Sequence, residues 1–345
     1  MSSTTLPATA TVRHLLIWHQ GALGDLLLAA PALAAISRHY AGARITALGH
    51  PEGWGLLAEN LPLQEVWDSG QTRWTPLFGK GILPPSLAER LARFQLALVF
   101  SPRPRAELQS RLHQAGIPAV HWLPSFPENG IEAAANLQAR RLAALGLHYQ
   151  PAPFKLALGD RPENQPSELP GPGPWLALAP GSGQARKNWP LSHYYEVSRA
   201  LAWEFSLQVV WLAGPAEEAI LPYLKALAQA QGHLLLANRP LARIARVLSR
   251  GRIYLGNDSG LTHLAAAVSG PEVLALFGPT DPRVWAPLGP HVQTIAAPCP
   301  QAPCAVGRSI PCPESHCLEA LAPETVLAAA AQLLSSPRAS KKPEI

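Results

Sequence analysis

The sequence predicts an α/β protein made of two Rossmann-like domains in series, each with a doubly wound parallel sheet. Three observations support this prediction. Short apolar runs alternate with helical patterns along the chain, which is typical of parallel βαβ units. This alternation is interrupted by one stretch rich in proline, glycine and charge, and then it restarts. Apolar residues form 48% and charged residues 15% of the 345 residues, a globular composition long enough for two cores.

The first half of the pattern, residues 12–158, contains five short apolar runs that we expect to be strands. A helical pattern follows each run, and the first helix is apolar nearly all round its first turns. Gly146 stands where the fifth helix should end, a common position for glycine. The expected strands are 14–19, 44–50, 66–70, 96–101 and 119–123, and the helices are 26–41, 53–61, 87–94, 106–116 and 131–145.

The second half repeats this order after a break. Residues 159–174 have the composition of an exposed linker between domains. We therefore expect a second domain over 175–334 and a polar, frayed tail over 335–345. Its expected strands are 175–180, 207–214, 233–238, 253–258 and 273–279, and its helices are 191–205, 215–232, 241–251, 259–270 and 322–334.

The charge distribution excludes a nucleic-acid-binding arm. The net charge is +5, with 14 basic and 11 acidic residues up to residue 165 and 14 and 12 beyond it. This mild positive bias favours anionic small molecules or a lipid head group carrying phosphate or carboxylate. The start of the chain has no export signal, and the longest apolar run is interrupted by Pro31. We expect a cytoplasmic protein that can contact a membrane surface.

The segment "APGSGQARKNWP" (179–190) connects an expected strand to a helix. Ligands of parallel sheets bind at the carboxyl ends of strands, where such loops lie. Gly181, Ser182 and Gly183 allow close backbone approach, and Arg186 and Lys187 bring positive charge. The loop can therefore hold a diphosphate, although it lacks the Walker A spacing. The alternative is a surface turn with solvated basic residues.

The segment "YLGNDSGLTHLAAA" (254–267) also ends a strand and enters a helix, at Ser259–Gly260. The free N–H groups of a first helical turn stabilise an anionic ligand, and Gly260 lets it come close. Asp258 and Ser259 are also ordinary N-cap residues, so the alternative is a capped helix with His263 packed on its face.

Two further strand-end loops carry acids. In "WLAGPAEEA" (211–219), an acid just after a nucleotide-binding strand can hold ribose hydroxyls, or it can simply favour the helix dipole. Glu217 and Glu218 are both candidates. In "FGPTDPRVWAP" (277–287), Thr280 and Asp281 are expected to line the same site.

The N-terminal segment "HQGALGDLLLAAPAL" (19–33) places a single carboxylate, Asp25, between a glycine and three leucines. Asp25 either caps the apolar helix that follows or takes part in chemistry. Gly21 and Gly24 would then let a substrate approach the backbone beside it.

The ordered set "GALGDLLLAAPAL", "PGSGQARKNWP", "GNDSGLTHLAAA" and "LFGPTDP" resembles glycosyltransferase family 9, the ADP-heptose:lipopolysaccharide heptosyltransferases. The resemblance covers about residues 14–334. It implies a GT-B fold, in which two Rossmann-like domains face each other across a cleft. It places the nucleotide sugar on the C-terminal domain and the acceptor glycolipid on the N-terminal one, with inversion at the anomeric centre.

The resemblance also implies roles for individual residues. Asp25 would be the general base, Lys187 would contact the diphosphate and Glu217 would hold the nucleotide ribose, with Glu218 competing for that role. The sequence departs from the family in its "GSG", which replaces more usual small-residue or threonine variants. The other implied donor contacts are Ser182, Gly183, Asp258, Ser259, Gly260 and His263.

The chemistry of the transfer favours a reaction without metal or cofactor. Lys187, Arg186 and the helix start at Ser259–Gly260 can stabilise the departing diphosphate. The sequence offers no paired acids of the kind that hold a divalent cation to a diphosphate. Arg103, Arg105 and Arg111 in "SPRPRAELQSR" (101–111) could pair with phosphates or carboxylates of an anionic inner-core glycolipid at the inner membrane, or lie in a solvated loop.

Four cysteines, Cys299, Cys304, Cys312 and Cys317, lie within nineteen residues, with His316 beside the last. Their spacing lacks the C-x₂-C of common zinc sites, so free thiols or transient disulfides are favoured over zinc or an iron–sulfur cluster.

Three other functions stay open. The chain could use another nucleotide sugar and another glycan acceptor on the same fold. It could be a nicotinamide-dependent oxidoreductase, although no G-x-G-x-x-G follows an expected strand. It could also be a non-catalytic nucleotide-sugar-binding relative.

Overall fold

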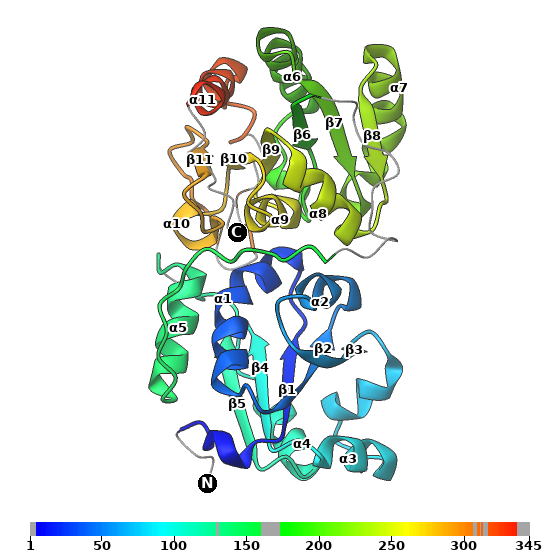
Figure 1. Cartoon of the computed structure of the whole chain (residues 1–345), viewed down its shortest axis with the longest axis vertical. Helices are drawn as coiled ribbons and strands as arrows, with labels where there is room; N and C mark the ends of the chain where they lie inside the picture. Colours follow the sequence, from blue (N-terminus) through cyan, green and yellow to red (C-terminus); the bar gives the residue numbers. More distant parts are fainter. Residues whose placement is uncertain are drawn as a thin grey trace. The chain divides into compact units, whose positions relative to one another are not determined.

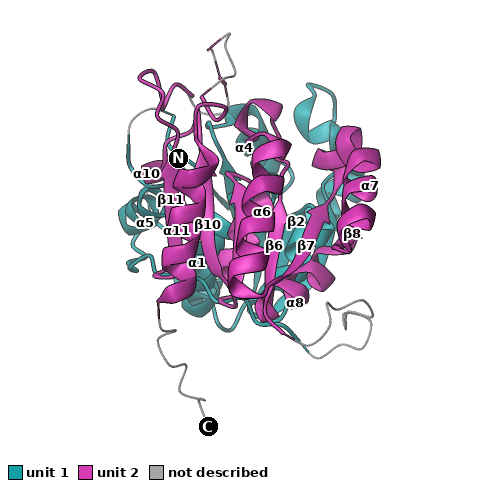
Figure 2. Ribbon diagram, turned by 90° about the horizontal axis from the view of Figure 1, so that it is seen from above, with its two compact units in different colours: residues 1–159 teal, residues 160–345 magenta. Residues whose placement is uncertain are grey.

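A computed structural model gives the fold and describes residues 5–128, 131–159, 173–305, 309–310, 312 and 317–336. The chain divides into two compact units, residues 1–159 and 160–345, shown in different colours in Figure 2. Most of the expected linker, residues 160–172, and the end of the expected tail, 337–345, lie outside the described residues.

The first unit is built on a five-stranded parallel sheet with the order β3-β2-β1-β4-β5. Helices connect the strands, as the prediction of a doubly wound α/β fold requires (Figure 1). The strands are β1 His14–His19, β2 Arg44–Gly49, β3 Leu63–Asp68, β4 Leu96–Ser101 and β5 Ala119–Pro124. The helices are η1 Thr9–Thr11, α1 Leu23–His39, α2 Pro51–Leu57, η2 Thr72–Phe78, α3 Pro85–Ala92, α4 Ala106–Gln114 and α5 Ala134–Ala144.

The second unit has a six-stranded parallel sheet with the order β11-β10-β9-β6-β7-β8. The strands are β6 Trp175–Ala179, β7 Gln208–Ala213, β8 Leu234–Ala237, β9 Ile253–Asn257, β10 Glu272–Phe277 and β11 Val292–Ala296. The helices are η4 Ala185–Lys187, α6 Leu191–Phe205, η5 Pro215–Ile220, α7 Leu221–Gln231, α8 Leu241–Arg250, α9 Gly260–Ala267, α10 Pro282–Trp285 and α11 Pro323–Ser335.

The structure differs from the sequence expectation at element ends and at one sheet edge. Strand β11 was not expected, because its residues are only partly buried and show no apolar run. The expected helix 215–232 is divided into η5 and α7, with Pro222 in the first turn of α7. Helix α1 begins at Leu23 instead of residue 26, so its first turn includes Asp25.

Each unit has its own core. In the first unit, Trp18, Trp74 and Phe94 pack with aliphatic side chains of the central strands and of α3 and α4. In the second unit, Trp189, Tyr194 and Trp211 pack with β6, β7, β9 and β10. These cores fix the strand ends, and the loops at the carboxyl ends carry the residues considered below. None of the described helices is long and apolar enough to cross a membrane.

Candidate functional site

In the second unit, the loop after β6 is tied to the end of β9 by Asn257. The Asn257 side-chain amide donates to the Pro180 carbonyl at 2.7 Å, and its Oδ1 accepts from the Trp189 backbone N–H at 3.0 Å. The Tyr194 hydroxyl donates to the same oxygen at 3.0 Å. Asn257 is fully buried, so these bonds hold the "GSG" loop beside the start of α9.

Within this loop, Ser182 is turned toward its own chain. Its Oγ lies 2.7 Å from the Gln184 carbonyl and 2.6 Å from Asn188 Oδ1, and its single proton can be donated to one of them. A Cβ added at Gly183 would meet nothing within 4 Å. The loop therefore leaves open space at Gly183, where a ligand could approach the backbone.

Glu217 bridges the ends of β6 and β7. Its Oε1 accepts from the Gly181 N–H and its Oε2 from the Gly214 N–H, both at 2.8 Å. Burial raises the pKa of this carboxyl, while the backbone N–H donors act in the opposite direction. A Cβ at Gly181 would overlap the Glu217 carboxylate, so a larger residue there would displace this carboxylate from its N–H donors. Glu218, the competing candidate, is exposed.

Lys187, Asp258 and Thr280 form a charged cluster across three strand ends. Lys187 Nζ lies 3.0 Å from Asp258 Oδ2, and the Thr280 hydroxyl donates to the same oxygen at 2.8 Å. The side chains of Lys187 and Asp258 are both largely buried. A charge-assisted bond in such surroundings holds the ammonium in one position. Asp281, the other expected residue of this loop, pairs instead with Arg283.

His263 lies in α9, one turn after Ser259, the N-cap residue, and Gly260, the first residue of the helix. Burial lowers the pKa of His263 to about 4, although Asp258 acts to raise it. His263 is therefore neutral at pH 7, and its electrostatic interaction with Asp258 and Lys187 places it with the charged cluster. His263 is also buried on α9, so the alternative interpretation, a histidine packed on the face of a capped helix, is equally compatible with the structure.

Arg186 and the cysteine segment meet in this unit. Arg186 Nη1 donates to the carbonyls of Ile310 and Cys312 at 2.7 and 2.6 Å, so its guanidinium contacts that segment. The four cysteines are partly buried, and none of them forms a disulfide bond. Burial raises the pKa of Cys304, with Cys312 and Cys299 as neighbours. His316 lies outside the described residues. Within the described part, no group of three or more potential ligands is arranged to hold a metal.

In the first unit, Asp25 lies buried in the first turn of α1. Its Oδ2 accepts from the Ala22 N–H at 3.0 Å, so it stabilises the start of the helix. The neighbouring Gly21 N–H donates to His19 Nδ1 at 3.2 Å. A Cβ at Gly21 would lie 2.6 Å from His19 Cε1 and 2.8 Å from Asp25 Oδ2, which explains the glycine. Gly24 lies inside the same helical turn.

His19 is a residue that the sequence analysis did not single out. It is the last residue of β1, it is buried, and its ring centroid lies 5.6 Å from that of Phe100. Its Nδ1 fixes the turn that presents the Ala22 N–H to Asp25. A signal was present in the sequence, because a histidine that ends an apolar strand just before a glycine is placed to accept from the backbone of the turn that follows.

The arginines expected to bind the acceptor follow β4. Arg103 and Arg105 are both exposed; Arg103 Nε lies 3.1 Å from Glu128, and the Arg105 guanidinium lies 5.9 Å from the Phe78 ring centroid. Arg111 has a structural role, since its Nη2 donates to the carbonyls of Pro76 and Gly81. Arg103 and Arg105 thus stay candidates for anion binding.

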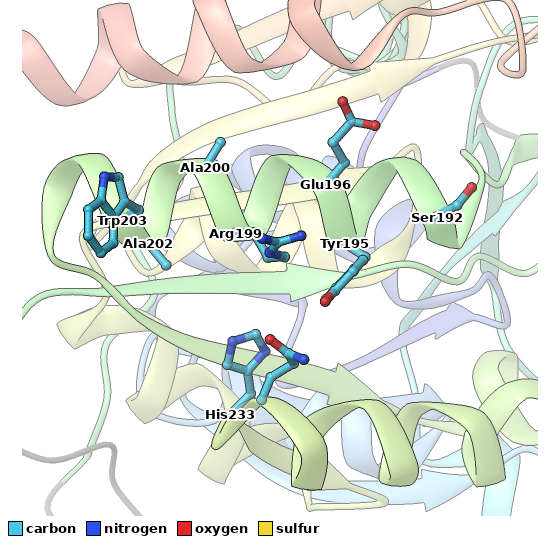
Figure 3. A pocket seen from close by; sticks show the side chains of 9 residues that line it. Ser192, Tyr195, Glu196, Arg199, Ala200, Ala202, Trp203 and His233 are labelled. Atoms are coloured by element: carbon cyan, nitrogen blue, oxygen red, sulfur yellow. The ribbon is translucent and has the colours of Figure 1, made fainter.

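A groove of about 890 Å³ lies along α6, near the start of β8 (Figure 3). Its labelled lining includes Tyr195, Glu196, Arg199, Trp203 and His233, and it contains none of the residues predicted for the donor or acceptor. The predicted donor residues are therefore gathered at the strand ends and not in this groove.

The chemistry available at the strand ends of the second unit is that of an anion site. It combines a fixed ammonium, an open glycine and the start of α9, which carries a partial positive charge. The first unit offers a buried carboxylate beside a turn and two exposed arginines. A carboxylate can accept a proton from a hydroxyl, and arginines can bind phosphate or carboxylate.

Comparison with known sequences identifies relatives. The sequence model of glycosyltransferase family 9 (heptosyltransferase) matches residues 128–317, more than half of the chain. Lipopolysaccharide heptosyltransferase 1 of Pseudomonas aeruginosa is 28% identical over 203 residues, 58% of this chain and 52% of that protein. The chain thus spans about half the length of this curated relative. Lipooligosaccharide heptosyltransferase 2 of Campylobacter jejuni (serotype O:6) is 22% identical over 91% of this chain and 96% of that protein.

Comparison with solved structures gives the same fold. The family 9 glycosyl transferase of Veillonella parvula superposes with a TM-score of 0.77 at 16% identity, covering 96% of this chain and 99% of that one. The ADP-heptose lipopolysaccharide heptosyltransferase II of Escherichia coli superposes with a TM-score of 0.66 at 20% identity, covering 93% and 98%. The two-sheet architecture is that of the GT-B fold, as predicted.

Proposed function

Because this chain belongs to glycosyltransferase family 9, we propose that it transfers a heptose, or a related sugar, from a nucleotide-diphosphate donor to a hydroxyl of the lipopolysaccharide inner core. We propose ADP-heptose as the donor and inversion at the anomeric carbon. The observation that carries the proposal is the cluster of Lys187, Asp258 and Thr280 at the strand ends of the second unit.

The donor diphosphate would bind at this cluster. Lys187 is held by Asp258, so its ammonium is in place before the ligand arrives, and Gly183 leaves room for the phosphates. Ser259 and Gly260 begin α9, whose N-terminal amides favour an anion. We assign the ribose to Glu217 in preference to Glu218, because Glu217 lies at the end of β7 between the two loops and Glu218 points to solvent.

In the transfer step, the acceptor hydroxyl gives its proton to the carboxylate of Asp25 as its oxygen attacks the anomeric carbon. The new C–O bond forms while the bond from the anomeric carbon to the diphosphate oxygen breaks, and the electron pair leaves with the diphosphate. Lys187 and the start of α9 stabilise the negative charge on the leaving group, so the step needs no metal ion. A positioned base contributes about 10²–10⁴-fold to such a reaction.

The acceptor would contact the first unit near Gly21 and Gly24, with Arg103 and Arg105 binding its anionic groups. Arg105 is exposed and lies over Phe78, so its guanidinium is presented at the surface. We place the reaction at the cytoplasmic face of the inner membrane, where a glycolipid acceptor would be reached by peripheral contact.

Two experiments test the proposal. Thermal-shift titrations with ADP, UDP, GDP and NAD compare the nucleotide classes, because a ligand at 100 times its Kd stabilises by about 2.7 kcal/mol. Stabilisation by ADP is expected, and stabilisation by NAD alone would contradict the transferase. Turnover with ADP-heptose and a defined lipid A–Kdo acceptor then tests the reaction, and binding of ADP without turnover of any nucleotide sugar would indicate a non-catalytic relative.

A further inference from the structure

Residues 78–82, "FGKGI", form an unusually apolar part of the exposed surface of the first unit. Ile82 is 96% exposed and Phe78 is 44% exposed, and Lys80 between them is also exposed. Single exposed apolar side chains are common, but apolar side chains gathered on one exposed segment are a feature of surfaces that bind another surface.

Arg111 and Trp18 hold this segment in place. Arg111 Nη2 donates to the Gly81 carbonyl at 2.6 Å and to the Pro76 carbonyl at 3.0 Å. The Phe78 ring packs edge-on against Trp18 in β1, with centroids 5.9 Å apart. The apolar side chains are therefore presented by a fixed backbone and cost little conformational entropy to order on binding.

Positive charge surrounds these apolar side chains. Arg73 and Lys80 are exposed, and the Arg105 guanidinium lies against the Phe78 ring. A hollow of about 390 Å³ is lined by Phe78 and residues 104–108, and the acid that lines it is Glu107. Apolar side chains that sit among basic ones are the combination that binds an anionic lipid surface.

Trp203, another exposed aromatic side chain, has different surroundings. Trp203 in α6 is 91% exposed, but Glu196 and Glu204 are exposed on the same helix together with Arg199. An acidic balance around an aromatic ring disfavours an anionic lipid surface. Charge thus distinguishes the two surfaces.

We propose that residues 78–82, with Arg73 and Arg105, dock the first unit onto an anionic bilayer, with Ile82 and Phe78 inserted at the head-group level. The inference rests on the proposed function in one respect: docking on a bilayer would bring the protein to an acceptor that is itself held in that bilayer. The occupant is the bilayer itself, so binding requires neither donor nor acceptor.

The test measures co-sedimentation of the full chain with vesicles of phosphatidylcholine plus phosphatidylglycerol, and with vesicles of phosphatidylcholine alone. We expect binding to the anionic vesicles that weakens as salt is added. Lys80→Glu should lower the partition coefficient more than about fivefold, the value for loss of one basic charge. Ile82→Ser should also lower it, and Ile82→Trp should raise it, because tryptophan favours the interface.

Ile82 and Lys80 are exposed, so these variants should fold normally, and Trp203→Ser is the matched control for loss of an exposed apolar side chain. Two results would overturn the proposal: no binding of the wild-type chain to anionic vesicles, or binding that Trp203→Ser abolishes and Ile82→Ser leaves unchanged. Turnover with a deacylated, water-soluble acceptor should be the same in Ile82→Ser and wild type. Loss of vesicle binding is thereby separated from failure of the proposed reaction.

Discussion

The strand-end loops of the two units are stabilised in different ways. In the first unit, the hydrogen bonds from Gly21 to His19 and from Ala22 to Asp25 join residues only two or three positions apart. In the second unit, Lys187 contacts Asp258 across 71 positions, and Gly181 contacts Glu217 across 36. A local turn can be altered without disturbing the rest of its sheet, whereas a change in the second unit loosens several strand ends together.

The largest effect is expected from a substitution of Asp25 in the local turn of the first unit. Asp25→Asn keeps an oxygen that can accept from the Ala22 N–H, so folding and ADP binding should stay close to wild type. Loss of the base should reduce kcat by about 10²–10⁴-fold. The measurement is kcat alongside the Kd for ADP. Asp68→Asn is the control, because Asp68 also accepts a local backbone N–H, from Gly70 at 2.8 Å. Normal turnover in Asp25→Asn would show that Asp25 only stabilises the helix start.

In the second unit, Lys187→Ala should weaken ADP binding by about 10–100-fold, the value of a charge-assisted hydrogen bond. It should also lower the melting temperature of the free protein, because it leaves the buried Asp258 carboxylate without its ammonium partner. Calorimetric titration with ADP and a thermal melt measure both effects. Lys225→Ala, on the exposed face of α7, should change neither. An unchanged Kd for ADP in Lys187→Ala would show that the diphosphate does not bind at this cluster.

The glycines of the "GSG" loop provide a matched pair. Gly181→Ala places a methyl group against the Glu217 carboxylate and should reduce the free energy of unfolding by about 2 kcal/mol. Gly183→Ala enters open space and should leave it nearly unchanged. Urea unfolding of the free protein compares them. Equal stability of the two variants would mean that the Glu217 bridge does not hold the strand ends together.

The smallest expected effect is the pH dependence that His263 contributes. Its folded pKa of about 4 is below the ordinary value of 6.5, so below pH 6.5 the unfolded chain binds more protons and stability falls. Between about pH 7 and pH 5 this loss should amount to about 1–2 kcal/mol. His263→Gln should reduce the loss, measured by urea unfolding at both pH values, and His148→Gln at an exposed position is the control. If His263→Gln loses as much unfolding free energy between pH 7 and pH 5 as the wild type, the lowered pKa of His263 is not the cause of that loss.

The sequence predicted the parts of the fold whose signals are local. Buried strands such as β1, β4, β9 and β10 are continuous apolar runs, and the fold class and the expected order of strands and helices followed from them. Strand β11 was missed because its side chains are only partly buried. Its place beside β10 depends on tertiary pairing and not on its own composition.

In the candidate site, too, features that depend on neighbouring residues could be predicted and features that depend on distant loops could not. The carboxylate of Asp25, beside a glycine turn, could be predicted because its surroundings lie within a few residues. The pairing of Lys187 with Asp258 could not, since two distant loops meet only when β6 and β9 pair. The contact of Arg186 with Ile310 and Cys312 could not be predicted either, because it joins residues more than 120 positions apart, and the expected contact of Arg186 with a phosphate stays a prediction.

The turn between β1 and α1 has a consequence for the specificity of the two units. A helix that follows a parallel strand is a natural phosphate site, and both units contain such helices. At α1, however, consecutive amides of Gly21 and Ala22 are already used by His19 and Asp25. A diphosphate approaching α1 would meet the negative charge of Asp25, and the two amides just before the helix would not be free to bind it. The Asp25 carboxylate, which we propose as the base, would thereby also disfavour binding of the nucleotide to the first unit.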